Sequence, residues 1–171
     1  MTPHVPRITV RTASTDDYPD IARLTVDAYR ADGQLADDEG YDAVLADVAG
    51  RASAAELLVG VDAAGRVVGS VALVLHGSPL AEIAGPGEAE FRMLAVDPAA
   101  QGQGVGQALV AACVSRARYA GATALLIYTR DFATRAHRLY ARFGFVRVPE
   151  RDWSPIPGMN LLALRRDLAT D

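Results

Sequence analysis

The stretch that most constrains this chain is residues 90–109, EFRMLAVDPAAQGQGVGQAL. Its short apolar run, residues 91–96, predicts a strand that stops at the turn pair Asp97-Pro98. Three alternating glycines follow, and apolar residues take up helical spacing from Val105 onward. A glycine loop that enters a helix points several unpaired backbone N–H groups, and the positive end of the helix dipole, at one place. This arrangement is typical of a phosphate-binding site.

Residue identity excludes two well-known phosphate loops. A Walker A loop ends in Gly-Lys-Ser/Thr, and this chain has no lysine, so its 17 Lys-or-Arg residues are all arginine. A dinucleotide fingerprint, G-x-G-x-x-G, fails because its last position would be Gln107 counted from Gly102, or Leu109 counted from Gly104. The pattern that remains is a glutamine followed by three alternating glycines.

The segment V-x-P-x-x-Q-G-x-G-V-G-x-x-L resembles motif A of the GCN5-related N-acetyltransferases (GNAT superfamily). The resemblance implies that the loop binds the pyrophosphate of acetyl-CoA, the acetyl donor, and that the preceding strand edge pairs with the pantetheine amides. It also implies that a backbone N–H of this strand holds the acetyl oxygen, as in an oxyanion hole. The alternative is a glycine-rich turn without a ligand. The implied cofactor-binding residues are Leu94, Ala95, Val96, Gln101, Gly102, Gln103, Gly104, Val105, Gly106 and Gln107.

Residues 135–145, RAHRLYARFGF, resemble GNAT motif B, A-x-x-L-Y-x-x-x-G-F. In that motif the tyrosine hydroxyl faces the coenzyme A sulfur, so the resemblance makes Tyr140 the candidate general acid; the alternative is a tyrosine packed on the core. Reference pKa values near 10 for tyrosine and 8.5 for a thiol make full proton transfer uphill by about 2 kcal/mol, so Tyr140 would act mostly by hydrogen-bonding the sulfur. The family often has asparagine seven residues earlier, where this chain has Ala133, which puts the pantetheine contact in doubt.

An acetyl acceptor must also lose a proton. Glu90 is the candidate general base, because many family members carry a carboxylate at this place and because it shares a strand face with Leu94 if no bulge intervenes. The alternative is a solvated strand carboxylate. Glu88, Tyr128 and Asp131 are weaker candidates, and Cys113 is expected to be a core residue.

The rest of the chain predicts the element order β-αα-βββ-α-β-α-β-β. This order is that of the GNAT fold, so the resemblance implies an α/β (α+β) fold with a mixed central sheet of about seven strands and four helices, in a single domain over residues 7–168. The fourth and fifth strands are expected to be parallel, because a helix connects them. In the family these strands splay apart and admit the cofactor. The helix signals include Ile21, Leu24 and Ala28 on one face, and Tyr41, Val44, Leu45 and Val48 on a second helix.

Composition excludes several classes of function. The chain has 171 residues and a net charge of −4, which disfavours nucleic acid as a partner. No apolar run predicts a membrane span and no signal peptide is evident, so the cytoplasm is the expected location. One cysteine and three scattered histidines show no metal-ligand spacing, and no metal cofactor is expected.

The sequence therefore predicts an acetyl-CoA-dependent N-acetyltransferase that transfers acetyl directly to an amine of a small molecule or peptide. The alternative is a coenzyme A-binding module that has lost catalysis and serves regulation or assembly. Transfer to oxygen or of another acyl group is not separated by these motifs, and a homodimer is left open. An acidic mouth at Asp37, Asp38 and Glu39 predicts a cationic acceptor, but no motif identifies it.

Overall fold

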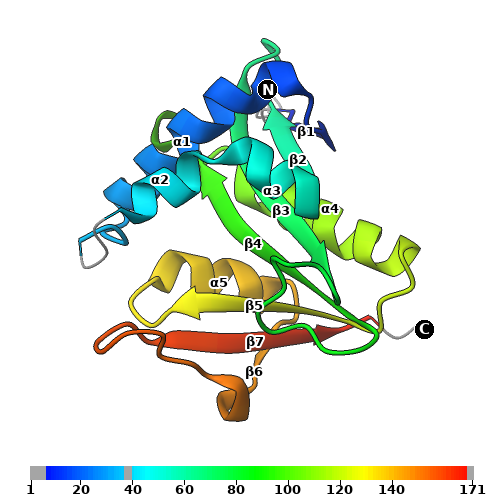
Figure 1. Cartoon of the computed structure of the whole chain (residues 1–171). Helices are drawn as coiled ribbons and strands as arrows, with labels where there is room; N and C mark the ends of the chain where they lie inside the picture. Colours follow the sequence, from blue (N-terminus) through cyan, green and yellow to red (C-terminus); the bar gives the residue numbers. More distant parts are fainter. Residues whose placement is uncertain (1–6, 37–39, 169–171) are drawn as a thin grey trace, which may run out of the picture. The chain divides into compact units, whose positions relative to one another are not determined.

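The strands of the computed structural model form a mixed seven-stranded sheet in the order β1-β2-β3-β4-β5-β7-β6 (Figure 1). The structure describes residues 7–36 and 40–168. The strands are β1 (Thr9–Thr12), β2 (Glu56–Val61), β3 (Val67–Leu75), β4 (Glu88–Val96), β5 (Ala124–Arg130), β6 (Val146–Arg147) and β7 (Leu161–Asp167). The α-helices are α1 (Tyr18–Ala31), α2 (Tyr41–Ala46), α3 (Val48–Ala54), α4 (Val105–Tyr119) and α5 (Thr134–Arg142). This confirms the predicted order and mixed sheet, except that the described residues form five α-helices where four were predicted.

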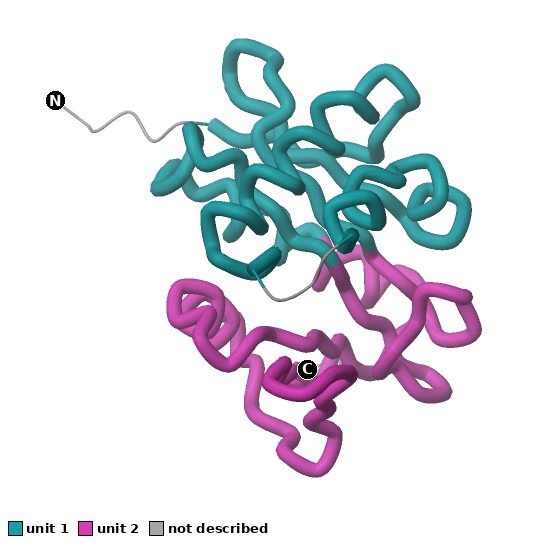
Figure 2. Tube along the Cα trace, turned by 60° about the vertical axis from the view of Figure 1, so that its left-hand side comes forward, with its two compact units in different colours: residues 1–72, 93–112 teal, residues 73–92, 113–171 magenta. Residues whose placement is uncertain are grey.

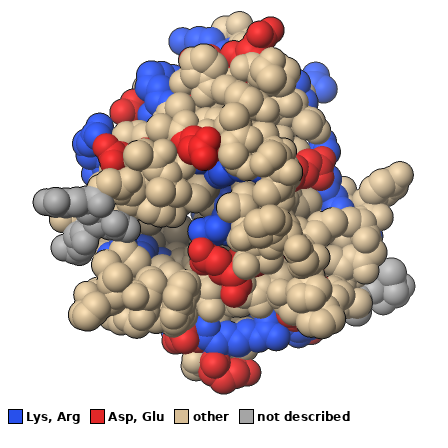
Figure 3. Space-filling model, viewed as in Figure 1, with Lys and Arg blue, Asp and Glu red and all other residues tan. Residues whose placement is uncertain are grey.

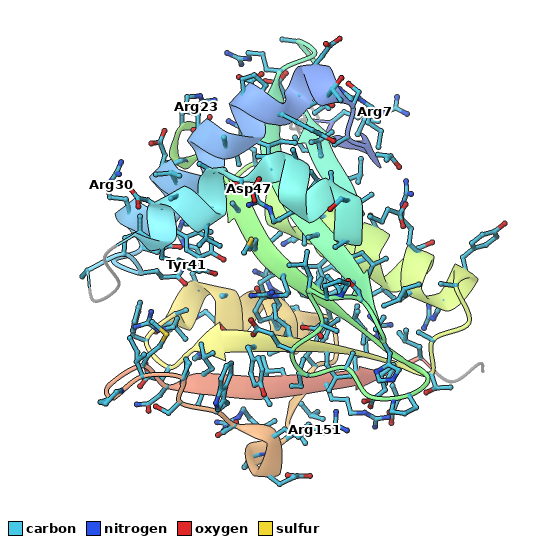
Figure 4. All side chains as sticks on the ribbon, in the orientation of Figure 1. Arg7, Arg23, Arg30, Tyr41, Asp47 and Arg151 are labelled. Atoms are coloured by element: carbon cyan, nitrogen blue, oxygen red, sulfur yellow. The ribbon has the colours of Figure 1, made fainter. Side chains whose placement is uncertain are left out.

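The additional helix arises because the predicted second helix breaks at Asp47. This residue has φ −79° and ψ 71°, outside the helical region, and its side chain accepts the Gly50 N–H at 3.1 Å. Aspartate favours such a capping position because its carboxylate replaces a missing backbone acceptor. Asp47 therefore ends α2 and begins α3 (Figure 4). The prediction of a single helix there was wrong, because an apolar stripe does not reveal a capping side chain in its middle.

The chain packs as two compact units (Figure 2). Unit 1 holds residues 1–72 and 93–112, and unit 2 holds residues 73–92 and 113–171. Three elements, β3, β4 and α4, begin in one unit and end in the other. The glycine loop therefore belongs to unit 1, whereas Glu90 and Tyr140 belong to unit 2.

In unit 1, helices α1 to α3 lie on one face of the strands and the first half of α4 on the other (Figure 1). The predicted inner face of α1 is confirmed, since Ile21 and Leu24 are both 0% exposed. On the other face, α4 approaches the strands closely at two glycines. A Cβ atom on Gly69 would lie 2.5 Å from Val105 Cγ1, and one on Gly60 would lie 3.3 Å from the same atom. The absence of side chains at these glycines therefore sets the position of the first turn of α4.

In unit 2, β5 pairs in parallel with the start of β4 and antiparallel with β7. The predicted parallel pairing is thus confirmed. An aromatic cluster joins α5 to this layer: the Tyr140 ring centroid lies 5.7 Å from that of Phe91 and 5.9 Å from that of Phe145. All three residues are buried, so this contact holds α5 in place.

Met93, in the middle of β4, has φ 54° and is the one non-glycine residue with positive φ among residues 7–36 and 40–168. Side chains rarely adopt this left-handed conformation, which is common at bulges and functional sites. It breaks the alternation of side chains between Glu90 and Leu94. Glu90 and Leu94 were expected to share a strand face only if the strand had no bulge. The conformation of Met93 means that this condition is not met.

The ion pair at the start of α1 predicts an acid-sensitive contribution to stability. Arg11 contacts both carboxylate oxygens of Asp17, at 2.7 and 3.0 Å, and Ser14 N–H donates to Oδ2 at 2.8 Å. The Arg11 hydrogen bonds are the main cause that lowers the pKa of Asp17 to about 2. Because the folded pKa is depressed, this stabilisation is present above the unfolded value near 3.9 and is lost as the pH falls toward 2.

We therefore expect Asp17→Asn to lower the thermal unfolding midpoint at pH 7, and this difference from the parent to vanish near pH 2. Asp16→Asn, an exposed neighbour in the same turn, is the control and should have little effect. Melting curves between pH 2 and pH 7 make the comparison. A deficit of Asp17→Asn that is equal at all pH values would contradict an electrostatic origin.

Candidate functional site

In unit 1, the turn after β4 is fixed by Asp97. Its backbone N–H donates to Val68 O at 2.8 Å, and its side chain accepts the Ala99 N–H at 3.0 Å. The chain then makes the short 3-10 turn Pro98–Ala100. These contacts tie the entry of the glycine loop to strands β3 and β4.

The glycine loop leads directly into the N-terminus of α4. Gly102 and Gly104 both have φ +80°, a conformation that favours glycine. Gly104 O accepts the Ala108 N–H at 3.1 Å, which is the first turn of the helical ladder. The N–H groups of residues 105–107 therefore lie ahead of any intrahelical acceptor.

The side chains of the loop leave its outer side open. Val105 is 1% exposed and packs inward, and a Cβ atom on Gly102 or Gly104 would meet no atom within 4 Å. Backbone N–H groups, the helix dipole and open space thus coincide, as an anion site requires. The structure brings the predicted residues 101–107 together in one loop and helix start, and their binding role stays a prediction.

The second set of predicted cofactor residues is Leu94, Ala95 and Val96 in the unit 1 part of β4. The ladder between β4 and β5 consists of three pairs, Glu88 to Glu90 with Ala124 to Leu126, and does not include residues 94–96. Ala95 is 2% exposed, whereas its two neighbours are half-buried. A strand edge that lies outside the β4–β5 ladder suits pairing with an extended ligand.

In unit 2, Tyr140 is 4% exposed and its ring packs against Phe91 and Phe145. Tyr140 is therefore packed on the core, as the alternative interpretation expected. A catalytic role for its hydroxyl is a separate proposal. Ala133 is the N-cap of α5, with no side-chain hydrogen bond to the helix start. An asparagine there would supply a capping group, so its loss affects the helix as well as any ligand.

Glu90 is a buried anchor, which the sequence did not predict. It is 1% exposed, and its Oε1 accepts three consecutive backbone N–H groups, from Glu82 at 2.8 Å and from Ile83 and Ala84 at 3.1 Å each. Successive N–H groups that converge on one oxygen form an anion-binding nest. Glu90 therefore holds the β3–β4 loop on the sheet, and the alternative of a solvated strand carboxylate is wrong. Its role as a base stays a prediction.

Glu88 contacts the end of the same loop and also binds Arg151, which lies in a second loop. It accepts the Gly85 N–H at 2.8 Å and pairs with Arg151 at 3.0 Å and with Arg165 at 3.4 Å. Burial alone would raise the pKa of Glu88, but these hydrogen bonds and charges together lower it below its usual value. A carboxylate so stabilised in its charged form is a poor proton acceptor, which disfavours Glu88 as the base.

The functional candidate that sequence reasoning missed is Glu82. Its side chain is 31% exposed and pairs with Arg92 at 2.6 Å. Burial raises the pKa of Glu82, with the Glu90 charge adding to the rise and Arg92 opposing it. Burial also raises the pKa of Tyr128, helped by the charges of Glu82 and Glu90. No sequence signal marked Glu82, because its setting depends on the loop that Glu90 holds.

Other classes of site find less support. Among residues 7–36 and 40–168, no group of three or more His, Cys, Asp or Glu side chains is placed to hold a metal ion. Within the same residues, no helix has the length and apolar character needed to cross a bilayer. Acidic and arginine side chains are interspersed on the face seen in Figure 3, without one large patch of either sign. The predicted mouth at Asp37, Asp38 and Glu39 lies outside the described residues.

The sequence model of the acetyltransferase (GNAT) family matches residues 18–145 of this chain. That match spans most of the chain, including the glycine loop and Tyr140. The chain belongs to this family. The family is described as one of acetyltransferases.

Individual relatives are more distant. A mycothiol acetyltransferase from Cellulomonas flavigena is 38% identical over 85 residues, which are 48% of this chain and 24% of that protein. The chain thus spans about a quarter of the length of this relative. A solved Corynebacterium glutamicum structure, described as histone acetyltransferase HPA2 and related acetyltransferase, has a TM-score of 0.74 at 24% identity and covers 98% of both chains. The yncA protein of Salmonella typhimurium, solved with acetyl-CoA, has a TM-score of 0.68 at 20% identity and covers 96% of both chains. These two structures support the fold.

The loop geometry predicts that Gly104→Val weakens acetyl-CoA binding by at least about tenfold, because a side chain would occupy the space that the pyrophosphate needs. Gly65→Val is the matched control: Gly65 has φ +83° and also meets no atom within 4 Å, but it lies in the β2–β3 turn of the same unit. Both variants carry the same backbone strain. Titration calorimetry should therefore show an affinity loss for Gly104→Val alone, and equal affinities in the two folded variants would overturn the loop assignment.

Proposed function

We propose that this chain transfers the acetyl group of acetyl-CoA directly to an amine of a small molecule or peptide, with both substrates bound at once. The observation that carries the proposal is the loop of residues 101–107, in which two left-handed glycines lead into the start of α4. This loop would bind the pyrophosphate through backbone N–H groups. Residues 7–168 would act as one domain.

The donor would be held along the strand segment Leu94 to Val96. Its backbone groups would pair with the pantetheine amides, and one N–H would hold the acetyl oxygen. As the amine nitrogen attacks the carbonyl carbon, negative charge grows on that oxygen, and an N–H already in place stabilises it without reorganisation. The C–S bond then breaks, and coenzyme A leaves as a thiolate.

Two proton transfers complete the reaction. Tyr140 would hydrogen-bond the departing sulfur and supply or relay its proton. Glu90 would accept the proton of the amine, through water, because its side chain is 1% exposed and one oxygen is occupied by three N–H groups. The packing of Tyr140 on Phe91 supports this division, since Phe91 and Glu90 are neighbours on β4 and alternate between faces.

The direct test is release of free thiol from acetyl-CoA across a panel of amines, including antibiotics, polyamines, amino acids and peptide N-termini. Product masses distinguish transfer to nitrogen from transfer to oxygen. The lack of lysine simplifies the assay, because self-acetylation is confined to the terminal amine. No thiol release from any amine would contradict the proposal. A cytoplasmic location and a homodimer are further predictions.

Tyr140→Phe should lower turnover by roughly 10²–10⁴-fold and leave acetyl-CoA affinity nearly unchanged. Phenylalanine keeps the ring that packs on Phe91 and Phe145, so a stability loss should not obscure the result. Tyr119→Phe, at a residue 96% exposed, controls for loss of a hydroxyl. Full activity of Tyr140→Phe would show that water protonates the thiolate.

Glu90→Gln should slow basic amines much more than weakly basic ones. At pH 7 an amine of pKa 10.4 needs about 4.6 kcal/mol for deprotonation, whereas an α-amine near 7.8 needs about 1 kcal/mol. Glutamine still offers an oxygen to the three N–H groups, so the loop should stay in place. The measurement is the pH–rate profile with both types of amine, and the variant should recover as pH rises.

Glu82→Gln is the comparison variant, since Glu82 lies in the loop that Glu90 holds. If the profile of Glu90→Gln overlays that of the parent while Glu82→Gln alone loses activity toward basic amines, the base is Glu82. If neither profile changes, both carboxylates are structural.

A further inference from the structure

The last residue of β5, Arg130, is a buried arginine without a charged partner. It is 7% exposed, and its Nε is buried with no hydrogen bond. Among residues 7–36 and 40–168, no carboxylate forms an ion pair with its guanidinium. A buried charge is costly unless an opposite charge or hydrogen bonds compensate it.

The one contact of this guanidinium that stands out is with an aromatic ring. Arg130 Cζ lies 4.8 Å from the ring centroid of Phe132, which is itself 46% exposed. A cation–π contact with a half-exposed ring compensates only a small part of the lost hydration. The described residues therefore offer this guanidinium no opposite charge, and the oxyanion of a ligand would supply one.

Register places Arg130 on the same sheet face as the candidate base. Glu90 pairs with Leu126 in the parallel ladder, and the β5–β7 register is unbroken from Ala124 to Arg130. With alternation every two residues, Tyr128 and Arg130 follow Leu126 on the face of Glu90. The influence of the Glu90 charge on the pKa of Tyr128 agrees with this arrangement.

The opposite face of this layer holds the donor side of the proposed reaction, since Tyr140 packs on Phe91. Arg130 therefore lies on the face assigned to the amine. Four residues of strand, from Leu126 to Arg130, cover about 13 Å. An anion at Arg130 would thus lie well away from a nitrogen near Glu90.

We propose that Arg130 binds an oxyanion of the acetyl acceptor, so that the acceptor is an amine carrying a carboxylate or phosphate-type group several bonds from its nitrogen. This inference rests on the proposed function, because it uses that function's acceptor face. Arginine suits the task, as its planar guanidinium donates two parallel hydrogen bonds to a carboxylate or phosphate.

The test uses ω-amino acids from 6-aminohexanoate to 12-aminododecanoate, each paired with its carboxamide, and ω-aminoalkylphosphonates of the same lengths as the phosphate-type probes. The full chain should prefer the anionic member of a pair by about 10- to 100-fold in kcat/KM, the range expected for a charge-assisted hydrogen-bonded pair. Arg130→Met should abolish this preference, and Arg130→Lys should keep part of it. Arg118→Gln, at an exposed arginine on the last turn of α4, is the control for net charge and should keep it all.

Two further measurements separate this role from folding and from the cofactor. The melting temperature of Arg130→Met should be unchanged or higher, because an uncompensated buried charge is removed. The KM for acetyl-CoA should be unchanged. A lower melting temperature with a parallel loss for anionic and neutral amines would show a structural arginine, and a raised KM for acetyl-CoA alone would assign Arg130 to the donor; either result overturns the proposal.

Calorimetric titration with the same pairs, in the presence of coenzyme A, distinguishes failure of this inference from failure of the proposed function. Selective binding of the anionic amines that Arg130→Met abolishes, without thiol release from acetyl-CoA, would support Arg130 and contradict acetyl transfer to these amines. Thiol release without any preference for an anion, in parent and variant alike, would contradict the role of Arg130 and leave the transferase intact.

Discussion

Unit 2 depends on how β4 satisfies two carboxylates, the buried Glu90 and the half-buried Glu88. Glu90 takes three backbone N–H groups of the β3–β4 loop, and Glu88 takes one N–H and two arginines. A charge out of water must be compensated locally, so these carboxylates require the loops to be where they are. The β3–β4 loop carries Glu82, and the loop before β7 carries Arg151. Both side chains are partly exposed. Removing either carboxylate would release a loop as well as a charge.

The sequence predicted the features that short-range patterns determine. The strand, turn, glycine loop and helix of residues 90–109 were correct because each signal is local and because they agree with one another. The inner face of α1 and the parallel pairing of β4 with β5 were also correct, since apolar periodicity and connection length decide them. The break at Asp47 was missed because a capping bond depends on one side-chain rotamer.

The features that the sequence did not predict depend on residues far apart along the chain. Glu90 is buried because a loop six to eight residues away folds over it. The charge of Arg130 stands out only once the burial and the ion pairs of the whole unit are known. Such positions break local rules, and a fold tolerates few of them, so they are the places where function is best sought.

The packing of α4 on Gly60 and Gly69 has a consequence for how sequence variation in this chain should be interpreted. These glycines lie in β2 and β3, yet a single methyl group on Gly69 would reach Val105 at 2.5 Å and displace the first turn of the helix. The backbone N–H groups of residues 105–107, which lack an intrahelical acceptor, would move with this turn. Substitutions in the two strands could therefore abolish cofactor use in a protein that still folds, and a survey restricted to ligand-contacting residues would classify them as silent.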